Sequence, residues 1–405
     1  MDSLGIEQIQ IVVLVGAIVA LISRRLKMPY TVGLVIAGLI VAFFHLPLGI
    51  SFSKDLLFKA LLPPLIFEAA LYIRWRELRR DLLPIVVYAT LGVVLSAGVT
   101  AAVMHYAAGW TWAAAVLFGI LIAATDPVSV IATFKESRVE GRLRLLVEAE
   151  SLFNDSTAAV GFAVALAFAS GAAVTFGSSV AAIFLSVIGG IVSGLLVGGI
   201  VLLVIGRTQD HLVELSMTTV AAFGSFWLAE YFQMSGILAT TTAGLMIGNM
   251  PGLSTLTKKG ERSIEHFWDF AAFVANSLIF IVLGINLAYQ DLARTAVPII
   301  VAILAVLVGR AVAVYPCSAI FSRSRFKVDP KHQHIMFWGG LRGALALALA
   351  LGVPAELPYR QEILTVTFGV VAFSVFVQGL TIPALLRRSG QIADNRKDSQ
   401  PGNAM

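Results

Sequence analysis

Acidic side chains interrupt two of the long apolar stretches in this sequence, where a charge is rare and costly. Asp126 is followed directly by Pro127, whereas Asp155 follows Ser151 and Asn154 in a second stretch. The spacing of Ser151, Asn154 and Asp155 places all three on one face of a helix. Carboxylate, hydroxyl and amide oxygens are ligands for hard cations. The pattern therefore predicts a cation site inside the apolar region.

Asp126 and Asp155 are expected at similar depth on two antiparallel helices. The hairpin apex between them lies near Glu140, 14 residues after Asp126 and 15 before Asp155, and each residue adds about 1.5 Å along a helix. Burial and a neighbouring acid both disfavour a charged carboxylate, so a proton and a cation compete for it. A site that holds either ion but is rarely empty exchanges one ion for the other.

Pro127 predicts a break in the helix that carries Asp126. Proline has no amide hydrogen for the carbonyl of Ala123, and it biases the residue before it away from helical geometry. Backbone freed at that depth must face protein or a water-filled cavity. Its carbonyl oxygens would then suit a cation. The alternative is a structural kink beside a buried, hydrogen-bonded acid.

A third acid, Glu68, follows Pro63 and Pro64 in another apolar stretch. It lies about two helical turns before the basic residue Arg74. Glu68 either completes the ion site or forms a structural pair with a basic residue. The sequence leaves both interpretations open.

Arg342 lies among the glycines Gly339, Gly340 and Gly343, which weaken a helix and allow another backbone to approach closely. The stretch lies seven spans after the one that contains Asp126, an odd offset that reverses its direction, as an inverted repeat requires. We therefore predict two crossed, interrupted helices. Arg342 would neutralise a nearby acid and the dipole charges of the broken ends. Arg310 is expected to pair with an acid or with carbonyl groups.

The elements that carry these residues are expected to be membrane-spanning helices. The chain has 405 residues, of which 58% are hydrophobic and 13% charged, against roughly 25% charged in soluble domains. We predict an all-α polytopic membrane protein with thirteen spans, in two inverted six-helix repeats whose crossing helices, the fifth and twelfth, are interrupted. The predicted spans are 6–23, 30–48, 56–73, 82–104, 111–134, 143–169, 178–206, 212–231, 235–249, 267–287, 295–321, 333–353 and 362–386.

Charge distribution predicts the topology. Most of the 29 basic residues lie in alternate loops and the C-terminal tail, whereas the other loops hold Lys54, Arg294 and Arg360. This asymmetry predicts an outside N-terminus and a cytoplasmic C-terminus in the plasma (inner) membrane. Residues 1–388 would form one transmembrane domain, and 389–405 a short disordered tail.

Several function classes have little support in the sequence. It contains no G-x-G-x-x-G or Walker motif, so neither a nucleotide nor another cofactor is expected, and the basic residues do not indicate a nucleic-acid partner. A cation channel is one rival, but broken helices around one competing site suit alternating access better. An intramembrane aspartyl protease would use Asp126 and Asp155 together, but its glycine-rich motifs are missing. We therefore expect a transporter and not an enzyme.

The motifs around these residues resemble those of NhaP/NHE-type sodium/proton antiporters, the monovalent cation:proton antiporter-1 family. The resemblance covers essentially the whole membrane region. The matching segments are Thr125-Asp126-Pro127, Glu150 to Asp155, Gly339 to Ala344, Phe267-Trp268 and Phe376 to Ile382. Ala149 departs from the glycine that animal members often carry, and the long regulatory tail of those members is missing, so we expect a prokaryotic form.

The resemblance implies a thirteen-helix antiporter with a core bundle that moves like an elevator, a dimerisation bundle and a homodimeric assembly. It assigns Asp155 as the carboxylate that binds the cation and exchanges the proton. Asp126, Ser151, Glu68 and Thr125 would lie near the ion, with Asn154 and Pro127 in support. It also implies a buried ion bridge between Glu150 and Arg342.

The pair Asn154-Asp155 resembles the pattern of electroneutral exchangers, whereas electrogenic relatives carry two aspartates there. The resemblance therefore implies exchange of one Na⁺ or Li⁺ for one H⁺ by alternating access, in pH and sodium homeostasis. A K⁺/H⁺ antiporter of the same mechanism remains an alternative, because site size and ligand number are not visible in the sequence.

Overall fold

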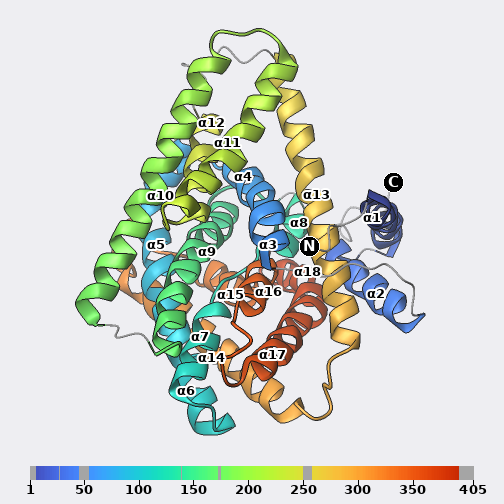
Figure 1. Cartoon of the computed structure of the whole chain (residues 1–405), viewed down its shortest axis with the longest axis vertical. Helices are drawn as coiled ribbons and strands as arrows, with labels where there is room; N and C mark the ends of the chain where they lie inside the picture. Colours follow the sequence, from blue (N-terminus) through green and yellow to red (C-terminus); the bar gives the residue numbers. More distant parts are fainter. Residues whose placement is uncertain are drawn as a thin grey trace, which may run out of the picture.

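A computed structural model of the chain describes residues 6–26, 28–44, 54–137, 139–171, 175–249 and 258–391. Every regular element in these ranges is helical, which confirms the predicted all-α class (Figure 1). The tail predicted over 389–405 lies outside the described residues from 392 onward.

The first half of the chain supplies the helices that surround the first interruption. They are α1 (Ile6–Leu26), α2 (Tyr30–Phe43), α3 (Lys54–Leu56), η1 (Leu57–Leu61), α4 (Leu62–Tyr72), α5 (Trp75–Val87), η2 (Tyr88–Gly92), α6 (Val93–Ala108), α7 (Trp112–Leu121), α8 (Val128–Ser137), α9 (Arg142–Ala169) and α10 (Phe176–Ile205).

The second half contains the second interruption. Its elements are α11 (His211–Tyr231), α12 (Gly236–Asn249), α13 (Lys258–Ala288), α14 (Ala296–Ile320), α15 (Pro330–Trp338), α16 (Ala344–Leu351), α17 (Arg360–Phe373), η3 (Ser374–Gly379) and α18 (Leu380–Arg388).

Each predicted span coincides with helix in the part of the chain that the structure describes. Seven helices there are long and apolar enough to cross a membrane, and α2 and α7 are shorter apolar helices. The chain is therefore a multi-pass membrane protein. The count of thirteen crossings and the inverted repeat stay predictions.

The two predicted interruptions are present. The first separates α7, which ends at Leu121, from α8, which begins at Val128. The second separates α15, which ends at Trp338, from α16, which begins at Ala344. Pro127 explains the first, because it cannot donate an intrahelical hydrogen bond, and the glycines at 339, 340 and 343 explain the second.

Within the described ranges, three π-helical turns, η1, η2 and η3, occur in otherwise continuous helices and were not predicted. Each lies close to a proline: η1 precedes Pro63, η2 follows Pro84 and η3 precedes Pro383. A missing proline amide frees a carbonyl group in the preceding turn, and a local π turn is one way to accommodate it at η1 and η3. Because η2 follows its proline, this reason does not apply to it.

The halves of the interrupted helices that begin after the breaks, α8 and α16, lie at the centre of the fold. Figure 1 shows α4, α8 and α16 near the middle of the molecule, between α9 and α13. Helix α13 packs against α2, α4 and α16, and its Gly284 backbone lies against Gly38 of α2. The interruptions are thus enclosed by longer helices on several sides.

Candidate functional site

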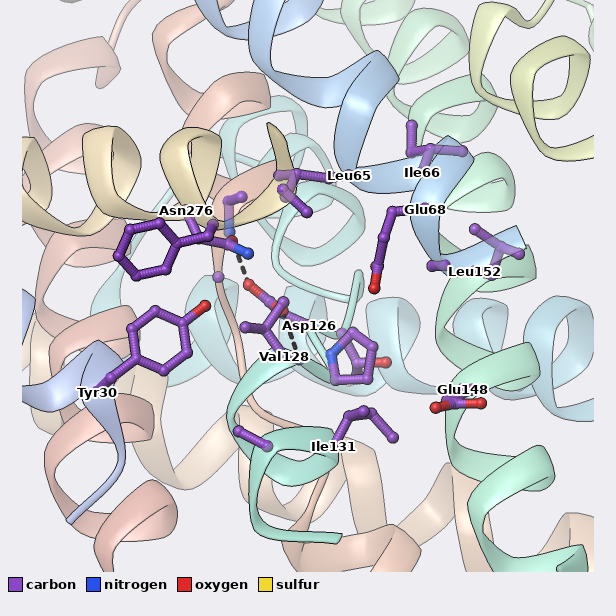
Figure 2. Close-up of a pocket in the computed structure, with 18 of the residues that line it drawn as sticks. Tyr30, Leu65, Ile66, Glu68, Asp126, Val128, Ile131, Glu148, Leu152 and Asn276 are labelled. Carbon is purple, nitrogen blue, oxygen red and sulfur yellow. Dashed lines mark hydrogen bonds between the residues drawn. The ribbon is translucent and has the colours of Figure 1, made fainter. Parts of the chain in front are cut away.

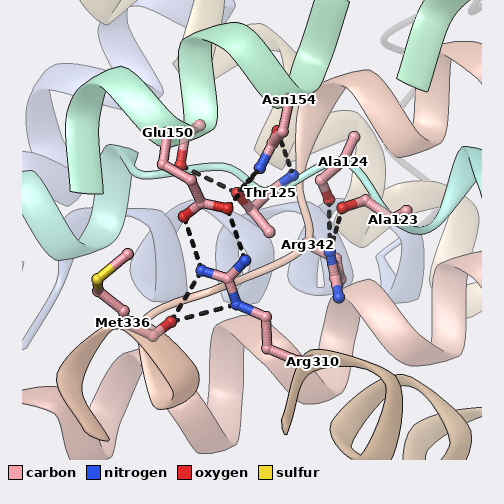
Figure 3. Close-up of polar contacts among 9 residues, drawn as sticks. Ala123, Ala124, Thr125, Glu150, Asn154, Arg310, Met336 and Arg342 are labelled. Carbon is pink, nitrogen blue, oxygen red and sulfur yellow. Dashed lines mark hydrogen bonds and ion pairs between the residues drawn. The ribbon is translucent and has the colours of Figure 1, made fainter. Parts of the chain in front are cut away.

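The two interruptions contact each other directly. The amide of Asp126 donates to the carbonyl of Leu341 at 2.8 Å. In return, Nη1 of Arg342 donates to the carbonyl oxygens of Ala123 at 2.6 Å and Ala124 at 3.0 Å (Figure 3). The predicted contact between the broken helices is therefore confirmed, and each break satisfies backbone groups that the other exposes.

The Asp126 carboxylate joins the N-termini of two half-helices. Its Oδ1 accepts from the amide of Val128 in α8 at 2.9 Å, and its Oδ2 accepts from the amide of Ala344 in α16 at 3.3 Å. Helix N-termini carry partial positive charge, so both stabilise an anion there. A Cβ on Gly343 would overlap this carboxylate, so the position requires glycine.

A cavity of about 420 Å³ opens beside this carboxylate. Four of the predicted ion-binding residues line it: Glu68, Thr125, Asp126 and Asp155. Figure 2 shows Glu68 and Asp126 pointing into the same space, with Tyr30 and Asn276 opposite Glu68. The cavity has room for a hydrated cation and offers it oxygen ligands.

Asp155 reaches the cavity from α9. Its Oδ1 is buried and has no hydrogen-bond partner among the residues that the structure describes. Buried polar atoms are nearly always hydrogen-bonded, and an exception calls for a partner outside the polypeptide. A cation or a proton on this carboxylate would supply one.

Thr125, in the break between α7 and α8, is held in place by two polar residues of α9, Asn154 and Ser151. Its amide donates to Oδ1 of Asn154 at 3.2 Å, and its hydroxyl accepts from Nδ2 of Asn154 at 2.6 Å (Figure 3). The hydroxyls of Thr125 and Ser151 are 3.0 Å apart. Ser151 does not line the cavity, so the structure brings it to Thr125 but not to the cavity surface. Its predicted place near the ion stays a prediction.

Glu150 forms its ion pair with Arg310, and the expected bridge to Arg342 is wrong. Nη1 and Nη2 of Arg310 donate to the two carboxylate oxygens at 2.6 and 2.7 Å, and Nη2 also donates to the carbonyl of Met336 at 2.9 Å (Figure 3). Arg310 thus pairs with an acid and a carbonyl group, as predicted. A Cβ on Gly340 would overlap the Arg310 guanidinium, which explains how this arginine reaches Glu150.

Arg342 is fully buried, and its guanidinium group binds backbone at the end of α7. It binds the carbonyl groups that follow this half-helix, where the partial charge is negative. The predicted position of Arg342 at the broken end is therefore confirmed, whereas no acid forms an ion pair with it among the described residues. Its Nε and Nη2 have no partner within the described ranges.

Charged residues gather at another part of the cavity, and most of them had no predicted role. Nζ of Lys135 lies 3.9 Å from a Glu68 oxygen and 4.0 Å from an Asp269 oxygen. Arg144 pairs with Glu148 at 2.8 Å. Glu68 therefore lines the cavity and also pairs with a basic residue, although not with Arg74.

Tyr30 and Asn276 are further cavity residues that the sequence analysis missed. The available signal was an asparagine in the middle of the apolar span 267–287. Among the described residues, no three His, Cys, Asp or Glu side chains converge as a metal centre would require. Asp126 and Asp155 thus share a cavity lined by mixed oxygen donors.

Comparisons with known proteins agree on one family. Residues 11–388 match the family model described as sodium/hydrogen exchanger, transmembrane. The low-affinity Na⁺/H⁺ antiporter NhaS1 of Synechocystis sp. is 38% identical over 402 residues, which cover 97% of this chain and 76% of that protein. The Na⁺/H⁺ antiporter ApNhaP of Aphanothece halophytica is 36% identical over 396 residues, with 96% and 76% covered.

The fold also matches a solved structure. The sodium proton antiporter MjNhaP1 from Methanocaldococcus jannaschii at pH 8 superposes with a TM-score of 0.77 at 21% sequence identity. The match covers 92% of this chain and 98% of that chain. At this identity the likeness establishes the fold.

Proposed function

Because this chain belongs to the sodium/hydrogen exchanger family, we propose that it exchanges Na⁺ for H⁺ across a membrane. Relatives that match nearly its whole length are named Na⁺/H⁺ antiporters. The single observation that carries the proposal is the unpartnered Oδ1 of Asp155 in a cavity shared with Asp126. Such an atom can hold a cation or a proton, but not both at once.

Each site residue has a distinct proposed role. Asp155 carries the cation or the proton. Asp126 holds the two half-helices together and contributes negative charge, while Thr125 and Glu68 supply further oxygens from the cavity wall. Ser151 and Asn154 fix Thr125. The Glu150–Arg310 pair and Arg342 secure the helices behind the site.

Competition for one carboxylate is the basis of the proposed exchange. A cation that enters the cavity displaces the proton from Asp155, and a proton arriving later displaces the cation. If the protein changes its open side only when the site is occupied, the two fluxes are coupled. One Na⁺ or Li⁺ then exchanges for one H⁺, and the cycle moves no net charge.

We further propose a homodimer in the plasma membrane of a prokaryote, with the N-terminus outside and the C-terminus in the cytoplasm. Its role would be pH and sodium homeostasis. The bacterial relatives and the basic loops support the location and the orientation. No cofactor is required by this cycle, since the ions are the cargo.

Transport by the purified protein in proteoliposomes tests the proposal. A pH-sensitive dye inside the vesicles reports proton movement when Na⁺, Li⁺ or K⁺ is added with the membrane potential clamped. We expect a saturable response to Na⁺ that does not depend on the potential. No response to any of the three cations across the pH range would refute exchange, and a response that follows the potential would refute the electroneutral stoichiometry.

A further inference from the structure

Asn276 lines the cavity and carries an oxygen atom that lacks a hydrogen-bond partner among the described residues. It lies on α13, lines the cavity beside Ala272 and Phe273, and is only 4% exposed. Its Oδ1 is buried and has no hydrogen-bond partner among the described residues. Leaving such an atom unpaired is unfavourable, and an apolar side chain of similar size would avoid the cost. The asparagine therefore calls for a partner that the polypeptide does not supply.

The surroundings of Asn276 indicate what that partner is. Tyr30 of α2 lines the same wall of the cavity as Asn276 (Figure 2). Figure 2 shows Tyr30 and Asn276 on one side of Asp126, facing the space that Glu68 enters from the other side. Three acids line the cavity with Asn276, namely Glu68, Asp126 and Asp155, and of these Glu68 has Lys135 3.9 Å away. A carbonyl oxygen in such a setting favours a cation.

We propose that Oδ1 of Asn276 is a ligand of the transported cation, contributed by α13 from the side opposite α9. This inference rests on the proposed function and adds a residue to its site. A neutral amide oxygen coordinates metal ions but does not titrate at physiological pH, unlike the carboxylates around it. Asn276 therefore strengthens the binding of Na⁺ without strengthening the binding of the competing proton.

The variant Asn276→Ala separates this role from a structural one. Initial rates of exchange in proteoliposomes, measured against Na⁺ concentration at several pH values, give the KM for Na⁺ and the constant for inhibition by protons. We expect the KM extrapolated to high pH to rise on the order of tenfold, as for the loss of one charge-assisted contact. The proton inhibition constant and kcat should stay near the wild-type values.

Ser277→Ala is the matched control. Ser277 is the next residue on α13, is equally buried, and its hydroxyl also lacks a partner within the described ranges. It packs against Gly16 of α1 and does not line the cavity. Its substitution should leave the KM for Na⁺ unchanged.

An unchanged KM in Asn276→Ala would overturn the inference, and so would an equal rise in the Ser277→Ala control. If Asn276→Ala does not fold, Asn276→Asp replaces it, because a carboxylate of the same shape also binds protons. The KM of that variant should depend more steeply on pH, and wild-type pH dependence would overturn the inference. Absence of Na⁺-driven exchange in the wild type would instead refute the proposed function.

Discussion

The carboxylate of Asp155 differs from the other acids of the cavity in its partners. Glu68 lies near Lys135, Glu148 pairs with Arg144, Asp269 accepts from the Tyr72 hydroxyl, and Asp126 accepts two backbone amides. In contrast, Oδ1 of Asp155 has no partner within the described residues. Of these acids, Asp155 is therefore the one whose binding capacity the protein itself leaves open.

Asp155→Asn should abolish Na⁺-driven proton movement and leave the protein folded. The amide keeps the shape of the side chain but cannot take up a proton or balance a cation's charge. Dye fluorescence in proteoliposomes measures the loss, and gel filtration in detergent checks the fold. Asp291→Asn, at an exposed acid outside the cavity, is the control and should retain full exchange. Wild-type exchange by Asp155→Asn would show that another group carries the ion.

Arg310→Met should destabilise the protein strongly. The substitution leaves Glu150 buried without its cation, and removing one partner of a buried pair costs about 3–5 kcal/mol. Thermal unfolding in detergent should show a lower Tm, and adding Glu150→Gln should restore part of it. Arg342→Met loses hydrogen bonds to two carbonyl groups and should cost less. A larger drop for Arg342→Met would favour the bridge that the sequence analysis expected.

Local signals made the two helix interruptions predictable. Pro127 acts on its own turn, and the glycines at 339, 340 and 343 weaken their own segment, so no knowledge of the tertiary fold was required. The ion-pair partner of Glu150, in contrast, could not be predicted from local signals. Arg310 is 160 residues away in the sequence, Arg342 was an equally charged candidate, and only the packing of α14 against α15 selects between them.

Gly343→Ala should impair exchange through the geometry of the second interruption. The added Cβ would overlap the Asp126 carboxylate, which must then move away from the N-termini of α8 and α16. We expect a lower rate and a higher KM for Na⁺ in the proteoliposome assay.

Gly98→Ala in α6 is the matched control, since nothing lies within 4 Å of the added Cβ. There the change should preserve exchange and stabilise the helix by about 0.5–1 kcal/mol. Equal effects of the two substitutions would contradict the proposed constraint.

Across the whole chain, hydropathy located helices better than it located the site. Every predicted span coincides with helix in the described ranges, because apolar length is a property of each segment alone. The cavity, however, combines residues from α2, α4, α8, α9, α13 and α16. Asn276 and Lys135 escaped the sequence analysis because their proximity to Asp126 arises only when these helices pack together.

The side to which the cavity opens can be tested by cysteine labelling. Cys317, the single cysteine of the sequence, is buried and can be replaced by serine to give a background without cysteine. Ala132 lines the cavity on α8, near the basic residues Lys135 and Arg144, whereas Ala355 is exposed beyond α16 at the opposite end of the second interrupted helix. Because basic loops face the cytoplasm, an impermeant maleimide should label Ala132→Cys in inside-out vesicles and Ala355→Cys in intact cells. High Na⁺ should slow only the labelling of Ala132→Cys, since this position shares the cavity with the acids. Labelling of Ala132→Cys from outside would show that the membrane orientation is opposite to the one proposed. The reason is that the sides assigned to residues 132 and 355 both follow from the direction of the same broken helices.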